Sequence, residues 1–169
     1  YSAGLHPWHI EKYDNYIFNK INHLASLSNV VAIGECGIDK LISTPIVNQI
    51  KEFEKHIILS ETCQKPLIIH CVRAWQELLG IYKHFKPSQR WIVHGFRGKP
   101  TIAQKLADEG LFLSFGGKFN KESLLAVPHN NILIETDDSK DISIYDVAHS
   151  VAMALAIDDE SLLNIIDNN

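Results

Sequence analysis

The stretch Val30-Val31-Ala32-Ile33-Gly34-Glu35-Cys36-Gly37 indicates which fold the chain adopts. Its first five residues, 30–34, carry no charge, which is typical of a strand buried on both faces of a parallel sheet. The strand is expected to end at Glu35, and the glycines on either side of this carboxylate let a ligand approach the backbone closely. Functional groups in parallel α/β folds collect at the carboxyl ends of strands. Glu35 is therefore the first candidate functional residue.

Apolar runs of the same kind recur along the chain, and most are followed by a helical pattern. Their ends are expected near residues 6, 35, 70, 94, 115 and 137. Strands that alternate with helices imply a parallel sheet with right-handed crossovers. Two closures fit: an open doubly wound sheet, or a TIM-type (β/α)8 barrel with about six of its eight strand–helix units present. No GxGxxG or GxxxxGK[ST] motif follows a strand, which weakens the nucleotide-binding versions of the open sheet.

Helices are expected wherever apolar residues recur at helical spacing between these strands. Pro7 should force a loop after the first strand, and Thr44-Pro45 resembles a helix cap followed by a first-turn proline. Gly110 is a plausible C-terminal stop for a short helix. The expected helices include residues 12–27, 75–82, 102–106, 144–157 and 160–166.

Composition fits a single domain over residues 1–169, with 46% hydrophobic and 21% charged residues. Neither a membrane-spanning stretch nor a signal peptide is recognisable, and Cys36, Cys63 and Cys71 form no CxxC pair, which favours free thiols in the cytoplasm. The net charge of −4 argues against holding nucleic acid by bulk electrostatics, although bound divalent cations could reverse this locally. Because the chain opens at Tyr1 and enters an apolar run at once, we expect an N-terminally incomplete domain.

Imidazoles and carboxylates recur at the expected strand ends, and together they are the ligand set of zinc and other divalent metals. Each alone has an ordinary alternative, as a satisfied polar residue or a helix cap. Their recurrence at successive strand ends favours a metal site, since strand ends converge on one face of a barrel. Histidines within helices, such as His23, His56 and His84, are better explained by packing or exposure. The strand-end candidates are His6, Glu35, His70, His94 and Asp137.

Five short motifs occur in a recognisable order: GLHPW at 4–8, GECGID at 34–39, IHC at 69–71, HGF at 94–96 and ETD at 135–137. They resemble the motifs of TatD-family metal-dependent deoxyribonucleases. That family belongs to the amidohydrolase-like superfamily of metal-dependent (β/α)8 barrels. The resemblance extends over nearly the whole chain and is specific, because several motifs match at compatible spacing.

The resemblance implies two divalent metal ions in the complete protein, with Glu35 as a bridging ligand and His70 and His94 as further ligands. The ligand set accepts zinc, manganese or magnesium. Asp137 would bind metal and the attacking water, and is the implied catalytic residue. His6 would line the substrate pocket nearer the phosphate than the metal, and Arg73 could contact phosphate. The implied activity is hydrolysis of DNA phosphodiester bonds, with 3′–5′ exonuclease action on single strands. Neither a membrane nor an obligate protein partner is implied.

The chain departs from the family pattern at three places. The usual first strand with His-x-His, which ligates one metal, is not part of the chain; Val72-Arg73 stands where many members have Arg-Asp; and Asp138-Ser139 replaces the common Ala-Pro. Two other functions stay open. One is hydrolysis of a C–N bond in a small amide or cyclic amide at the same kind of site. The other is a catalytically inactive scaffold or binding protein.

Overall fold

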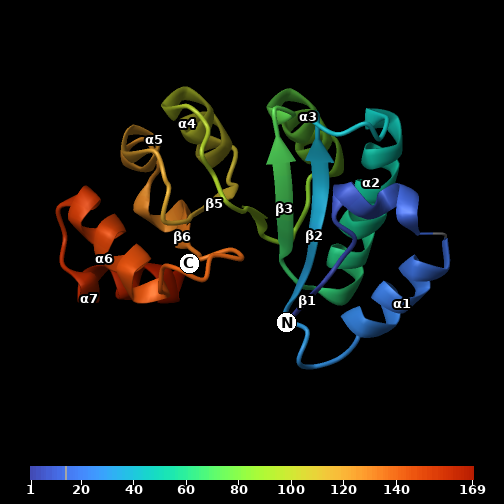
Figure 1. Ribbon diagram of the computed structural model, residues 1–169, viewed down its shortest axis with the longest axis horizontal. Helices are drawn as coiled ribbons and strands as arrows, with labels where there is room; N and C mark the ends of the chain where they lie inside the picture. The colour runs from blue at the N-terminus through green and yellow to red at the C-terminus, as the bar shows by residue number, and fades with distance from the viewer. Residues whose placement is uncertain (14) are drawn as a thin grey trace. The chain divides into compact units, whose positions relative to one another are not determined.

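The computed structural model describes residues 1–13 and 15–169, which form two compact units, 1–92 and 93–169. Strands and helices alternate in both units (Figure 1). The first unit contains β1 (Ser2–Ala3), the 3-10 helix η1 (Pro7–Lys12), α1 (Asn15–Ala25), β2 (Ala32–Asp39), α2 (Ile46–Cys63), β3 (Leu67–Val72) and α3 (Trp75–Phe85). After β4 (Trp91–Val93), the second contains α4 (Pro100–Asp108), β5 (Phe112–Phe115), α5 (Lys121–Leu125), η2 (His129–Asn131), β6 (Ile132–Ile134), α6 (Ile144–Leu155) and α7 (Asp159–Asn168).

The sheet of the first unit is parallel, as the sequence predicts. β1 pairs with β2 through Ala3 and Ile33, and β2 pairs with β3 from Ile33 opposite Leu67 to Asp39 opposite Val72. β2 and β3 lie side by side in Figure 1, with α2 packed against β2. Nearly all of β2 is buried, which explains its apolar composition.

The pairing of β2 with β3 is irregular at Gly34 and Glu35, within the stretch 30–37 that indicates the fold. Ile33 lies opposite Leu67 and Cys36 opposite Ile69, so Gly34 and Glu35 together occupy the space opposite one residue of β3. Such bulges re-aim side chains and are common beside functional sites. Gly34 has a φ of +136°, and a Cβ there would lie 2.5 Å from the carbonyl oxygen of Ile68, so only glycine fits.

β2 extends four residues beyond the end predicted from the sequence. The prediction that the strand stops at Glu35 is therefore wrong: Glu35 lies within the strand, and Asp39 is its last residue. The strand continues because Gly37, at a φ of +140°, lets the backbone approach the carbonyl of His70 closely, and because Ile38 remains in the core. β3 likewise continues past His70 to Val72.

The helices of the first unit differ from the predictions near their starts. The helix expected over 12–27 consists of α1, from Asn15 to Ala25, and Asp14 lies outside the described residues. Pro7 begins η1 rather than an irregular loop, since proline fits the first position of a helix. Thr44 is not the cap of α2, because Pro45 holds that position and no side chain caps the helix.

The second unit contains a parallel pair of strands covered by helices. β5 and β6 pair from Leu113 opposite Ile132 to Phe115 opposite Ile134. Phe96 and Phe115 pack edge to face in the core, with ring centroids 6.0 Å apart. Gly110 follows α4 at a φ of +96°, as expected of a residue that stops a helix. The short helix α5, capped by Asn120, was not predicted, and α6 and α7 end within a few residues of the expected bounds.

None of the helices in residues 1–13 and 15–169 combines the length and apolar character needed to cross a bilayer.

Candidate metal centre

A buried histidine in α2, His56, holds the loop that carries His6 in place. His56 is fully buried in α2; its Nδ1 lies 2.8 Å from the carbonyl oxygen of Glu52, and its Nε2 accepts the backbone N–H of Leu5 at 3.0 Å. Burial lowers the pKa of His56 and keeps the ring neutral. The expected packing role of His56 is confirmed, and the chain is anchored one residue before His6.

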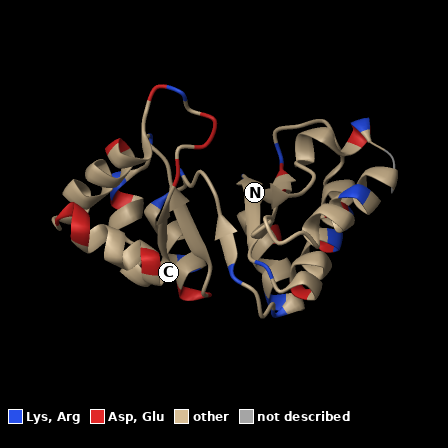
Figure 2. Cartoon of the chain, turned by 90° about the horizontal axis from the view of Figure 1, so that it is seen from below, with Lys and Arg blue, Asp and Glu red and all other residues tan. Residues whose placement is uncertain are grey.

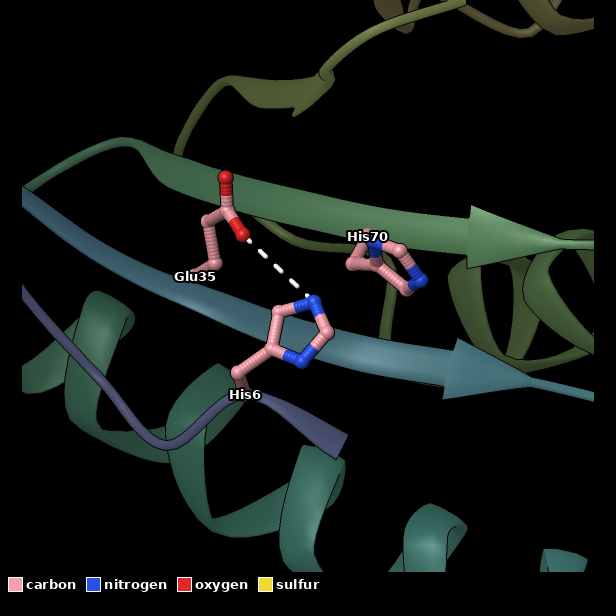
Figure 3. Close-up of side chains that lie close together, drawn as sticks. All are labelled: His6, Glu35 and His70. Atoms are coloured by element: carbon pink, nitrogen blue, oxygen red, sulfur yellow. Dashed lines mark ion pairs between the residues drawn. The ribbon is translucent and has the colours of Figure 1, made fainter. Parts of the chain in front are cut away.

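Three of the predicted site residues come together in the first unit. His6 follows β1, Glu35 lies at the bulge of β2 and His70 lies in β3, and their side chains point toward one another (Figure 3). One ligand atom from each lies within 4.8 Å of the others. Nε2 of His6 is 3.6 Å from Oε2 of Glu35, and the rings of His6 and His70 pack edge to face at 4.3 Å. The bulge and the short β1 thus gather residues that lie far apart in sequence.

Hydrogen bonding divides the chemical roles within this group. Nδ1 of His6 accepts the backbone N–H of Trp8 at 3.2 Å and caps η1. A neutral imidazole has one N–H, so the proton of His6 resides on Nε2, the nitrogen that faces Glu35. In this tautomer His6 donates a hydrogen bond, whereas a metal ligand needs a lone pair. Glu35 and His70 remain as the pair suited to a metal ion.

A carboxylate outside the predicted set contacts His70. Oδ2 of Asp39 lies 3.1 Å from Nε2 of His70 and accepts the indole N–H of Trp8 at 2.8 Å. Asp39 is 3% exposed. Burial alone would raise the pKa of its carboxyl, but hydrogen bonds from Trp8, from the backbone N–H of Leu41 and from His70 outweigh burial and hold the pKa below its ordinary value. Asp39 is therefore an ionised acceptor at neutral pH.

The second unit contains a similar arrangement at its own strand ends. His94 follows β4 and Asp137 follows β6, and a ligand atom of each lies within 4.8 Å of the other. Nδ1 of His94 lies 3.4 Å from Oε1 of Glu135, and both side chains are largely buried. Burial would raise the pKa of Glu135, but hydrogen bonds from His94, Ser114 and the backbone of Gly95 more than compensate and lower it.

Asp39 and Glu135 were missed as site residues although both lie inside the motifs singled out from the sequence. Asp39 is the last residue of GECGID and Glu135 is the first of ETD. Asp39 follows Glu35 by four residues and Glu135 precedes Asp137 by two. A sequence does not reveal, however, which imidazole nitrogen such a carboxylate contacts. The motifs could have pointed to Asp39 and Glu135, but the histidine that each carboxylate contacts is evident only from the fold.

The remaining predicted residues have less defined surroundings. Arg73 is exposed just after β3 with a φ of +54°, and Asp137 is exposed with a φ of +54°, a conformation that aspartate tolerates better than most residues. Cys36 and Cys71 are buried and, among the described residues, join no group of possible metal ligands. His149 lies in α6 on the surface, 3.1 Å from Asp159.

The donor sets of both units fit divalent metal ions. Each unit offers a carboxylate and an imidazole close enough to share an ion, and in each unit one nitrogen of that imidazole lies near a second carboxylate. Histidine ligands of metals are commonly oriented in this way by a carboxylate. The fold is that of an α/β protein, and these two residue pairs are its candidate ligands for divalent metal ions.

The chain belongs to the TatD related DNase family, whose model matches residues 1–168. It is 29% identical over 153 residues to an uncharacterized metal-dependent hydrolase of Buchnera aphidicola, covering 81% of this chain and 58% of the relative. It is 30% identical over 148 residues to a 3'-5' ssDNA/RNA exonuclease TatD of Erwinia tasmaniensis, covering 80% of this chain and 56% of the relative. The chain thus spans less than two thirds of the length of these relatives.

A solved structure confirms the fold. The crystal structure of YJJV, a TatD homolog from Escherichia coli, matches with a TM-score of 0.88 and 20% identity, covering 99% of this chain and 73% of that one. At this identity the likeness shows the fold alone. The predicted TIM-type α/β fold, with six of its strand–helix units in this chain, is therefore confirmed.

Proposed function

We propose that the protein is a metal-dependent hydrolase that cleaves phosphodiester bonds of DNA, acting from the 3′ end of single strands. The observation that carries the proposal is the repeated arrangement of carboxylate, imidazole and second carboxylate: Glu35, His70 and Asp39 in one unit, and Asp137, His94 and Glu135 in the other. The names of the relatives support hydrolysis and a nucleic-acid substrate.

The charge distribution favours a cation-dependent mode of substrate binding. Residues 93–169 carry 12 acidic and 6 basic side chains, a formal net charge of −6, whereas residues 1–92 carry 8 and 10, a net charge of +2. Acidic residues predominate on the helices of the second unit (Figure 2). A phosphate diester approaching such a surface is repelled unless bound cations offset the charge. Proteins that bind nucleic acid by bulk electrostatics have the opposite balance.

Each side chain has a defined part in the proposed reaction. A divalent ion, when bound, supplies a water of lowered pKa. Glu35 and Nδ1 of His70 would bind an ion in one unit, and Nε2 of His94 with Asp137 would do so in the other. Asp137 orients the attacking water and accepts its proton.

Two side chains are assigned to the substrate rather than to the metal. The Nε2–H of His6, which faces Glu35, is assigned as a donor to a phosphate oxygen, the role that the family resemblance implies for it. Arg73 is exposed and can reach a phosphate as a charged donor. That Glu35 bridges two ions stays a prediction from the family resemblance, and the cytoplasm as the location of the protein stays a prediction from the cysteine pattern.

The test compares two adjacent aspartates. Metal-depleted protein is supplied with Mn²⁺, Mg²⁺ or Zn²⁺ and incubated with a 5′-labelled single-stranded oligonucleotide, and shortening from the 3′ end is followed with time. Asp137→Asn should lower the rate by about 100-fold or more, because it removes the proton acceptor. Asp138→Asn, a neighbouring change of the same charge, should leave the rate close to that of the unmodified protein.

The same assay decides between the proposed substrate and its rivals. Equal rates for Asp137→Asn and the unmodified protein would remove Asp137 from the mechanism. Metal-dependent hydrolysis of a small cyclic amide without cleavage of the oligonucleotide would assign the protein to amide chemistry. A protein that binds no metal stoichiometrically by elemental analysis would be a scaffold.

A further inference from the structure

We propose that Asp39 is a positioning residue that fixes the tautomer of His70, so that Nε2 carries the proton and Nδ1 keeps the lone pair that a metal ion requires. This inference rests on the metal site of the proposed function and not on the identity of the substrate. Asp39 would act through His70 and would not itself contact metal or DNA.

Both oxygens of the Asp39 carboxylate are occupied by donors. Oδ1 accepts the backbone N–H of Leu41 at 2.8 Å. Oδ2 accepts the indole N–H of Trp8 at 2.8 Å and lies 3.1 Å from Nε2 of His70. A carboxylate has no proton to give, so the contact with His70 requires the imidazole to be the donor. The proton of a neutral His70 therefore resides on Nε2.

The backbone of Asp39 is held as firmly as its side chain. Its N–H donates to Oε1 of Gln49 at 2.7 Å, and its carbonyl accepts from Nε2 of Gln49 at 3.0 Å. Gln49 is 1% exposed and also donates to the carbonyl of Thr44 at 2.8 Å. This buried amide clamps the last residue of β2 to the start of α2. Rotation of the carboxylate away from His70 would leave buried donors without acceptors, which is costly.

Replacement of Asp39 by asparagine reverses the hydrogen-bonding preference at one atom. The amide oxygen can still accept from Leu41, which turns the NH₂ group toward Trp8 and His70. Both of these present N–H donors. His70 can form a hydrogen bond with the NH₂ group only if its proton moves to Nδ1 and Nε2 becomes the acceptor. That tautomer has no lone pair on the nitrogen proposed to bind metal. The replacement of one carboxylate oxygen by an NH₂ group thus predicts a specific loss of metal affinity.

The first experiment needs no variant of Asp39. In metal-depleted protein labelled with ¹⁵N, long-range ¹H–¹⁵N correlation spectra distinguish a protonated imidazole nitrogen from an unprotonated one, and comparison with His70→Asn identifies the signals of His70. In the neutral imidazole we expect the proton on Nε2 and none on Nδ1. A neutral His70 ring with its proton on Nδ1 would overturn the proposal outright.

The second experiment measures affinity for Zn²⁺ by calorimetric titration. Asp39→Asn should bind Zn²⁺ about 10- to 100-fold more weakly, the range found when the partner of a histidine ligand is lost. Its His70 signals should show the proton on Nδ1. Trp8→Phe is the matched control, because it removes the other donor to Oδ2 and leaves the contact with His70 intact. Its Zn²⁺ affinity should stay close to that of the unmodified protein.

The control separates positioning from mere support of the fold. If Asp39→Asn and Trp8→Phe weaken Zn²⁺ binding equally, local packing explains the effect and the proposal fails. It also fails if Asp39→Asn retains both the tautomer and the affinity. If Asp39→Asn does not fold, the spectra of the unmodified protein still decide. None of these readouts involves DNA, so absence of nuclease activity would refute the proposed function alone.

Discussion

His94 and Glu135 face each other across the end of the second unit's sheet, with Nδ1 of the imidazole 3.4 Å from Oε1 of the carboxylate. His94 follows β4 and Glu135 follows β6, so residues 41 positions apart form one buried pair. The ionised carboxylate leaves Nε2 of His94 as the nitrogen available to a metal ion.

Glu135→Gln should therefore weaken metal binding in the second unit. A glutamine can present its NH₂ group to His94 and favour the opposite tautomer, so we expect an affinity for Mn²⁺ or Zn²⁺ about 10- to 100-fold lower. Calorimetric titration measures the effect. Glu160→Gln, an exposed change of the same kind on α7, provides the control. Unchanged affinity in Glu135→Gln would show that Glu135 does not orient His94.

His6→Asn separates hydrogen-bond donation from metal ligation. Asparagine is a good helix cap and can still accept the N–H of Trp8, but it lacks the Nε2–H of His6. We expect kcat/KM on the oligonucleotide to fall by about 100-fold while Zn²⁺ affinity stays near that of the unmodified protein. His70→Asn should lose both. A large loss of Zn²⁺ affinity in His6→Asn would make His6 a ligand after all.

The first unit should become less stable at acidic pH because it loses the stabilising contribution of the Glu61 carboxylate. This carboxylate accepts the hydroxyl and backbone N–H of Ser88 and the N–H of Gln89. Burial would raise the pKa of Glu61, but these hydrogen bonds outweigh burial and lower it. A group whose pKa is lowered by folding stabilises the folded state above its unfolded pKa, about 4.3, and loses that contribution as the pH falls through the folded pKa.

Glu61→Gln should accordingly lower the free energy of unfolding at pH 7 by about 1 kcal/mol, a value reduced by exposure to solvent. The difference from the unmodified protein should shrink as the medium becomes acidic. Urea denaturation at several pH values measures it. Glu54→Gln, which removes the same charge from α2, is the control; identical curves for both variants would contradict the role of Glu61.

The three cysteines should differ sharply in reactivity. Burial raises the pKa of Cys71 to about 12 and that of Cys36 well above its ordinary value, so neither forms thiolate at neutral pH. Cys63, at the end of α2, is only half-buried. Brief treatment with iodoacetamide followed by peptide mass spectrometry should find Cys63 labelled first, and all three labelled in urea. Rapid labelling of Cys71 in the folded protein would indicate that β3 opens readily.

Much of the architecture could be predicted because apolar runs and turn residues are local signals. β5 and β6 lie close to the expected strand ends, β3 continues two residues past its expected end at His70, and Gly110 stops α4 as expected. The end of β2 was predicted wrongly because a charge within an apolar run resembles a terminus. Here the strand continues, since glycine and isoleucine after Glu35 keep the backbone paired.

The candidate site was predictable in its members and not in its contacts. His6, Glu35 and His70 converge, as do His94 and Asp137, because parallel strands place residues that are distant in sequence side by side. The partners Asp39 and Glu135 could not be assigned, since contact depends on registers and rotamers that residue types do not encode. The tautomers of His6 and His70 follow from those contacts and were equally out of reach.

The extra residue in β2 makes the length of this segment as important as its composition. Gly34 and Glu35 together face one residue of β3. Deletion of Gly34 would remove this bulge and shift the residues on one side of it by one position relative to β3, which turns their side chains to the other face of the sheet. A homologue or design that keeps every functional side chain but loses this single position would be expected to misdirect its carboxylate. Alignment gaps at this point should therefore be as rare as substitutions of Gly34.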